Sequence, residues 1–152
     1  MADFFKNALI YLLRLLAKGV LWRHRPTIIG VTGSVGKTSS KEAIFTVLSG
    51  RFRSRRNLKN YNNEIGVPLT ILGQASGGRS PWRWLKVLLI GFFEIFYARN
   101  YPEVLILEMG ADRIGDIAYL TNFVKCFIGV ITAIGEIPVH VEFFQTPAQV
   151  VK

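Results

Sequence analysis

Residues 27–39 read TIIGVTGSVGKTS, and this stretch decides the fold class. The first six of these residues are mostly β-branched and lie between a proline and a glycine, which predicts a buried strand over 27–32. A Gly-x-x-Gly-Lys-Thr core follows at 33–38, and the sequence after it predicts a helix over 38–48. A strand, a glycine-rich turn and a helix in this order are the context in which such a turn binds phosphate groups.

The residue types in this turn explain how it could bind a nucleotide. Glycines let backbone N–H groups approach phosphate oxygens, and the N-terminus of a helix adds partial positive charge. The Lys37 ammonium can reach the outer phosphates, and the Thr38 hydroxyl can coordinate Mg²⁺. The strict phosphate-loop pattern has glycine where this sequence has Val31, so a structural turn with an incidental lysine stays open as the alternative. The residues predicted to bind ATP are Gly33, Ser34, Val35, Gly36, Lys37, Thr38 and Ser39.

The composition is that of a folded protein with one domain. The chain has 152 residues, half of them apolar, which excludes a disordered protein, and its single cysteine excludes a disulfide framework. The charge is uneven, because residues 1–60 hold 12 Lys and Arg against 2 Asp and Glu, whereas residues 61–152 hold 7 against 8. The basic first part is compatible with a phosphorylated ligand, an anionic membrane, nucleic acid or a solvated basic face.

Two apolar segments predict long helices. Residues 4–22 carry Lys6, Arg14 and Lys18 on one stripe of such a helix, at about 100° per residue. A helix of this kind suits a membrane interface, and a helix packed on its own domain or on another domain is the equal alternative. A membrane span is less favoured, because it needs about 20 apolar residues. Residues 81–97 predict a second apolar helix, for which packing is favoured over membrane contact.

Apolar strands that alternate with helices predict an α/β fold with a mostly parallel sheet, covered by helices on both faces. Ligands of such sheets bind beyond the carboxyl ends of the strands. Glu108 ends one predicted strand, and His140 follows another. Beside Lys37 and Thr38 they would form a Mg²⁺ or Mn²⁺ site, whereas a solvated acid and a surface histidine are the alternatives. The other elements are predicted as strands over 51–56, 104–109 and 127–132 and helices over 65–72 and 114–123.

The order of these pieces resembles the central ATPase domain of the Mur ligases. The matching stretches are IIGVTGSVGKTSSKEAI (28–44), NYNNEIGVPLTIL (60–72), VLILEMGADRIGDIAYL (104–120) and VITAIGEIPVHVEFF (130–144). The asparagine pair before IGVPLT and the LEMGA block favour the family member that adds D-alanyl-D-alanine over the folylpolyglutamate synthetase relatives. We therefore expect a P-loop NTPase-like Mur ligase central domain, incomplete, over 27–152, preceded by an apolar helix and a basic linker over 1–26.

The resemblance implies an ATP-dependent amide ligase of peptidoglycan precursor synthesis. ATP would phosphorylate a carboxylate of a UDP-linked muramyl tripeptide, and the amine of D-alanyl-D-alanine would attack the acyl phosphate. The protein's part in phosphoryl transfer is mainly positioning and charge neutralisation. The resemblance implies catalysis by Lys37, Glu108 and His140, and phosphate binding by Gly33 to Gly36. It implies that Thr38 and Glu108 hold one Mg²⁺ and that His140 helps to hold a second. It places Asn62 and Asn63 in the substrate- and nucleotide-side loop. Capping of the helix that follows is the alternative for the two asparagines.

The 26 residues before the first strand are too few for the uridine-nucleotide-binding domain of that family. We expect the chain alone to bind ATP with Mg²⁺ without completing the reaction, in the cytoplasm and with no nucleic-acid partner. Two alternatives stay open. One is a membrane-apposed nucleotide-binding module that contacts the inner face of the plasma membrane through 4–22 and 81–97. The other is a related ligase with another acceptor, such as a glutamate-adding enzyme.

Overall fold

A computed structural model of the chain describes residues 2–58 and 60–134. The elements, in chain order, are α1 (Ala2–His24), β1 (Thr27–Thr32), α2 (Lys37–Ser49), β2 (Ser54–Arg56), α3 (Gly66–Leu72), α4 (Pro81–Tyr97), β3 (Val104–Glu108), α5 (Asp116–Thr121) and β4 (Ile128–Ile131). The strand, phosphate-turn and helix order expected around residues 27–48 is therefore confirmed, and the helix predicted over 81–97 has the predicted bounds.

The four strands form one parallel sheet in the order β2-β3-β1-β4. The fold is thus the predicted α/β class. Ile29 of β1 pairs with Ile106 of β3 on one side and with Ile128 of β4 on the other. Because β1 and β3 are the central strands, their carboxyl ends lie side by side. The turn after β1 and Glu108 at the end of β3 therefore meet at one edge of the sheet.

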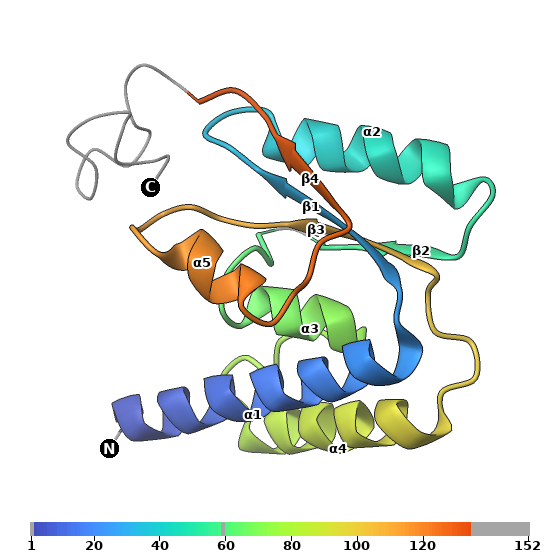
Figure 1. Cartoon of the computed structure of the whole chain (residues 1–152). Coiled ribbons are helices and arrows are strands. Elements are labelled where there is room, and N and C mark those ends of the chain that lie inside the picture. Colours follow the sequence, from blue (N-terminus) through green and yellow to red (C-terminus); the bar gives the residue numbers. More distant parts are fainter. Residues whose placement is uncertain (1, 59, 135–152) are drawn as a thin grey trace.

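Alternate residues of the central strands face opposite layers, as the pleat of a strand requires. Ile29 and Ile106 pack with Phe45 of α2, whereas Ile28 and Leu105 belong to the larger core on the other face. In Figure 1, α2 covers one face of the sheet, α3 and α5 cover the other, and α1 and α4 form a further layer beyond α3. The predicted cover on both faces is thus present for the central strands.

Helices α1 and α4 lie side by side and run in the same direction (Figure 1). Gly19 of α1 lies against Ile95 of α4, and Gly91 of α4 lies against Leu16 of α1, so glycines allow close approach at both places. Leu13, Ala17 and Val20 of α1 are fully buried and share a core with α3 and β3. The inner side of α1 therefore packs on the rest of the chain. Within the described residues, no helix is long and apolar enough to cross a membrane.

Some elements differ from the sequence-based expectation. The strand predicted over 51–56 covers only Ser54–Arg56. The helix predicted over 114–123 covers only Asp116–Thr121, because Gly115 has φ +93° and the Asp116 carboxylate accepts hydrogen bonds from the amides of residues 112 and 113. The apolar strand β4 lies at the edge of the sheet and is largely exposed, with Ile131 at 69%. An apolar strand does not reveal whether its place in the sheet is central or at the edge.

Candidate functional site

The turn after β1 has the backbone conformation of a phosphate-binding loop. Gly33 has φ +134° and Gly36 has φ +88°, both in the region that glycine adopts readily. A Cβ at Gly33 would come within 2.1 Å of the Thr132 hydroxyl, so no other residue fits there without a shift. The two glycines let the chain leave the strand and enter α2 at Lys37.

The amides of the loop divide into two groups. Ser34 and Val35 donate to the carbonyl of Ala133, which fixes the first half of the loop against the segment after β4. The amides of residues 36–39 donate to no other described residue, as is usual at the start of a helix. These four N–H groups at the N-terminus of a 13-residue helix can donate to phosphate oxygens. The predicted loop at 33–39 is thus bound to protein in its first half and open in its second half.

The Lys37 ammonium lies within the loop itself. Its Nζ donates to the carbonyls of Gly33, at 2.6 Å, and Ser34, at 3.2 Å. These bonds fold the side chain back over the loop, where the ammonium can stabilise oxygen atoms that bind in the centre of the turn.

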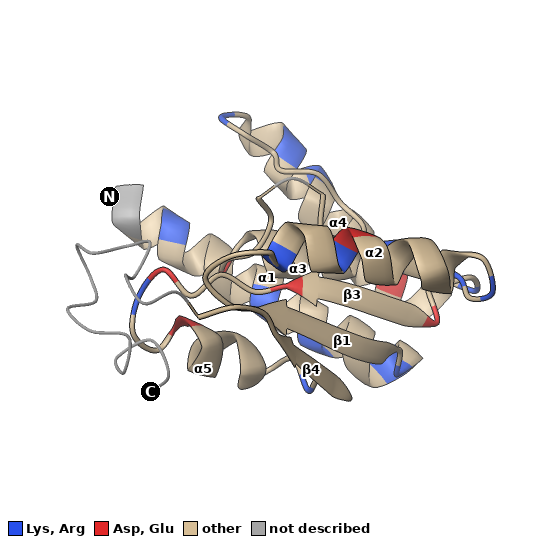
Figure 2. Ribbon diagram, turned by 90° about the horizontal axis from the view of Figure 1, so that it is seen from above, with Lys and Arg blue, Asp and Glu red and all other residues tan. Residues whose placement is uncertain are grey.

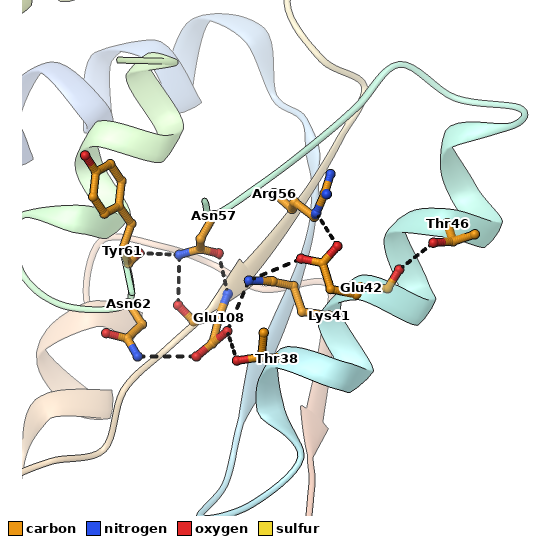
Figure 3. Close-up of polar contacts among 9 residues, drawn as sticks. All are labelled: Thr38, Lys41, Glu42, Thr46, Arg56, Asn57, Tyr61, Asn62 and Glu108. Carbon is orange, nitrogen blue, oxygen red and sulfur yellow. Dashed lines mark hydrogen bonds and ion pairs between the residues drawn. The ribbon is translucent and has the colours of Figure 1, made fainter. Parts of the chain in front are cut away.

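Glu108 and Thr38 meet at the sheet edge, as the sequence analysis predicted. The Thr38 hydroxyl donates to Oε2 of Glu108 at 3.0 Å, and Figure 3 shows the two side chains pointing toward each other from α2 and β3. Glu108 is only 4% exposed. A hydroxyl and a carboxylate are the oxygen ligands that Mg²⁺ prefers, so this pair fits one side of a magnesium site beside the open loop amides.

Asparagines of the 57–63 segment hold Glu108 from the other side (Figure 3). The buried Asn57 side chain accepts a bond from the Glu108 amide at 2.6 Å and donates to the Glu108 carbonyl at 3.1 Å and to the Tyr61 carbonyl. Asn62 donates to Oε1 of Glu108 at 3.3 Å. Asn63 instead accepts from the amide of Gly66 at 2.9 Å and thereby caps the start of α3. Of the asparagine pair, Asn62 thus contacts the site, and Asn63 has a structural role.

Lys41, like Asn57, is a site residue that the sequence-based prediction did not include. It is 1% exposed, and its ammonium lies 3.2 Å from Oε2 of Glu108, the oxygen that also accepts from Thr38. A fully buried lysine needs a paired charge. The signal was present in the sequence, because Lys41, Ile44, Phe45 and Leu48 have the i, i+3, i+4, i+7 spacing of the apolar side of α2.

A second ion pair extends this network toward the solvent. Oε1 of Glu42 lies 3.5 Å from the Lys41 ammonium, and Oε2 of Glu42 lies 2.7 Å from Nε of Arg56 on β2. The Arg56 guanidinium lowers the pKa of Glu42, and it also lies 3.8 Å from the centre of the Phe45 ring. Charges therefore alternate from Glu108 through Lys41 and Glu42 to Arg56 (Figure 3).

His140, which was predicted to help to hold a second Mg²⁺, lies outside the described residues. In residues 2–58 and 60–134, no group of three or more His, Cys, Asp and Glu side chains could hold a metal ion. In the described part of the site, Thr38 and Glu108 therefore supply oxygen ligands for a cation. A bound phosphate group would have to supply further oxygen ligands.

The relatives found by sequence comparison carry the same name. No established family profile matches the chain. The chain is 34% identical over 124 residues to the UDP-N-acetylmuramoyl-tripeptide–D-alanyl-D-alanine ligase of Bacillus subtilis, and 40% identical over 116 residues to the ligase of that name from Synechocystis sp.. These matches cover 82% and 75% of this chain but 22% and 20% of the relatives. The chain thus spans about a fifth of the length of the curated relatives it matches.

Solved structures agree with the sequence matches. The MurF ligase of Thermotoga maritima in complex with ADP superposes with a TM-score of 0.70 at 30% identity, over 93% of this chain and 27% of that one. A MurF structure from Acinetobacter baumannii superposes with a TM-score of 0.68 at 22% identity, over 91% of this chain, which supports the fold alone. The arrangement of sheet and helices described above is therefore that of part of these ligases.

Proposed function

We propose that this chain, which belongs to the Mur ligase family, is the nucleotide-binding part of an ATP-dependent ligase that joins D-alanyl-D-alanine to a UDP-N-acetylmuramoyl-tripeptide. The relatives at 34% and 40% identity carry the name of that ligase. We propose further that the 152 residues bind ATP with Mg²⁺ on their own and do not complete the reaction. The compartment that we propose is the cytoplasm, where ATP is available.

One observation carries this proposal. The Thr38 hydroxyl and the Glu108 carboxylate are 3.0 Å apart at the start of α2, where the amides of residues 36–39 donate to no other described residue. The chain therefore has donors for phosphate oxygens directly beside oxygen ligands for a hard cation. A structural turn with an incidental lysine would need neither the open amides nor a buried carboxylate beside them.

The residues of the chain would act on ATP by positioning and by charge. The amides of residues 36–39 and the Lys37 ammonium would bind the outer phosphates, and Thr38 and Glu108 would hold Mg²⁺. The bound Mg²⁺ would neutralise phosphate charge and so favour transfer of the terminal phosphoryl group to a substrate carboxylate. Asn62 and Lys41 hold the Glu108 carboxylate in advance, and Asn57 fixes the backbone of Glu108, which together reduce the reorganisation that binding requires.

Titration calorimetry of the 152-residue chain with ATP, with and without Mg²⁺, tests the nucleotide site. We expect Mg²⁺ to strengthen binding, and Lys37→Ala to weaken it at least tenfold, which corresponds to about 1.4 kcal/mol. The matched control is Lys6→Ala, an exposed lysine on α1 far from the loop. Equal ATP affinity for wild type and Lys37→Ala would contradict the loop assignment.

The ligase reaction is tested on the natural protein that carries this chain. We expect phosphate release from ATP only when both UDP-N-acetylmuramoyl-tripeptide and D-alanyl-D-alanine are present. Phosphate release with glutamate in place of the dipeptide would support the related ligase with another acceptor instead. Tight ATP binding without phosphate release under either condition would support a nucleotide-binding module without ligase activity.

A further inference from the structure

Helices α1 and α4 carry most of the exposed apolar surface of the chain. Of the 22 large apolar residues that are exposed in the described part of the chain, 13 lie on these two helices. They are Phe4, Phe5, Tyr11, Leu12, Leu15 and Trp22 on α1, and Trp82, Leu85, Leu89, Phe92, Phe93, Phe96 and Tyr97 on α4. A concentration of this kind marks a surface that binds something.

The exposed residues form one stripe along each helix, opposite the stripe that packs on the protein. On α1, Phe4, Tyr11, Leu15 and Trp22 fall within about 40° of one another, at about 100° per residue. The buried Leu13 lies about 180° away from Phe4 on the same helix. Because α1 has an apolar stripe on both sides, its outer stripe is not required by the core.

The same arrangement holds on α4. Leu85, Leu89, Phe92 and Phe96 follow the i, i+4, i+7, i+11 spacing of one helical stripe. The buried Val87 and Gly91 lie on the opposite side, against α1 and α3. Since α1 and α4 lie side by side in the outermost layer (Figure 1), their outer stripes adjoin; we call this surface the α1–α4 outer face.

Basic residues outnumber acidic ones on these two helices and in the residues next to them. Residues 1–25 and 79–99 contain nine Lys and Arg against Asp3 and Glu94, a net charge of +7. Figure 2 shows blue segments that recur along α1 and along α4. Lys18 lies at the edge of the α1 stripe, Lys86 lies on the flank of α4, and both are exposed. Lysine is depleted from the cores of protein–protein interfaces, whereas it is favoured where an apolar helix face meets anionic headgroups.

A hollow beside the outer face strengthens the case for an anionic surface. It has a volume of about 290 Å³, is open to solvent, and has both Lys18 and Lys125 among its lining residues, together with Trp22. Two ammonium groups and an indole beside an apolar stripe fit a phosphate headgroup at the boundary of a bilayer.

We propose that the α1–α4 outer face docks onto the surface of an anionic phospholipid bilayer, with both helices lying in the plane of the interface. The apolar stripes would enter the region between headgroups and acyl chains, and the exposed Lys18 and Lys86 beside them would contact the headgroups. Neither helix would cross the bilayer, in agreement with the hydropathy of the described helices. This docking does not depend on the ligase reaction.

The tryptophans of the chain provide the probe. All three, Trp22, Trp82 and Trp84, lie on α1 or α4. The 152-residue chain is mixed with vesicles of phosphatidylcholine alone or with 30% phosphatidylglycerol, some of them with brominated acyl chains. We expect sedimentation with the anionic vesicles and quenching of tryptophan fluorescence by the brominated chains. Failure to sediment, or sedimentation without quenching, would overturn the proposal.

Matched variants identify the surface. Leu15→Ser with Leu89→Ser removes two half-exposed residues of the outer face, and Val47→Ser with Leu58→Ser removes two exposed apolar residues elsewhere. We expect the first pair to reduce vesicle binding at least tenfold, the second pair to leave it unchanged, and both to retain ATP affinity as a check of folding. Lys18→Glu with Lys86→Glu should remove the preference for anionic vesicles. Equal binding by the two serine pairs would overturn the assignment.

Sedimentation equilibrium without lipid tests whether the α1–α4 outer face instead binds a second copy of the chain. If the chain forms a dimer that Leu15→Ser with Leu89→Ser dissociates, the outer face binds a second copy and the membrane proposal is wrong. A monomer that binds anionic vesicles supports it.

Discussion

The Thr38 hydroxyl donates a 3.0 Å hydrogen bond to the Glu108 carboxylate across 70 positions of sequence. The parallel pairing of β1 with β3 makes this contact, because it brings the start of α2 and the end of β3 to one edge of the sheet. The same carboxylate oxygen lies 3.2 Å from the buried Lys41 ammonium. The candidate magnesium ligands are thus held by a buried ion pair within the fold.

The Lys41–Glu108 pair predicts strong energetic coupling. Lys41→Met and Glu108→Gln each leave one buried charge without its partner, and we expect each to lower the free energy of unfolding by about 3 kcal/mol. The double variant leaves no unpaired charge, so its loss should be much smaller than the sum. Urea unfolding of the four proteins measures the coupling.

The exposed pair of Arg53 and Glu103 is the control for this cycle. Its atoms lie 3.6 Å apart with side chains 55% and 50% exposed, and we expect no measurable coupling there. Additive losses in the Lys41 and Glu108 variants would mean that the buried pair does not act as a unit.

We also expect the Asn57 side chain to contribute to the stability of the fold. Its side chain bonds both the amide and the carbonyl of Glu108 and is fully buried. Asn57→Ala would leave these backbone groups without partners, at a cost of about 1–3 kcal/mol. We also expect weaker ATP binding in Mg²⁺, because the strand end that carries Glu108 is no longer fixed. Asn100→Ala, at an exposed position, is the control; similar unfolding midpoints for the two variants would contradict this role.

Much of the fold was predictable because local signals decide it. The glycine-rich turn at 33–36, the apolar strand at 104–108 and the helix Pro81–Tyr97 each carry a complete pattern within the segment itself. The exposure of β4 was not predictable, because its place at the sheet edge depends on the order of all the strands. Among the site residues, the meeting of Thr38 and Glu108 was predictable, because the turn after one parallel strand and the end of another lie at the same edge of the sheet. Asn57 acts only through backbone groups that are distant in sequence, and no local pattern marks it.

We expect position 33 to require glycine. At φ +134°, and with the Thr132 hydroxyl in the place of a Cβ, Gly33→Ala should cost at least about 1–3 kcal/mol of stability and should weaken ATP binding by shifting the loop. Gly129→Ala is the control, because no atom of the described residues lies within 4 Å of its added Cβ. Thermal unfolding and calorimetry on both variants give the comparison. A Gly33→Ala protein with wild-type ATP affinity would show that the observed loop conformation is not needed for binding.

We expect the ion pair of Glu42 with Arg56 to make the free energy of unfolding depend on pH. The Arg56 guanidinium lowers the pKa of Glu42 below its usual value of 4.5 in the folded chain. A lowered folded pKa stabilises the folded state above the unfolded pKa, and this contribution is lost as the pH falls through the folded value. Wild type should therefore be more stable than Glu42→Gln at pH 7, and the difference should shrink as the pH falls below about 4. Because the Glu42 side chain is 44% exposed, solvent screening keeps the difference small. Urea midpoints of both proteins between pH 7 and pH 3 measure it, and a constant difference over that range would show that the Arg56 pair does not contribute.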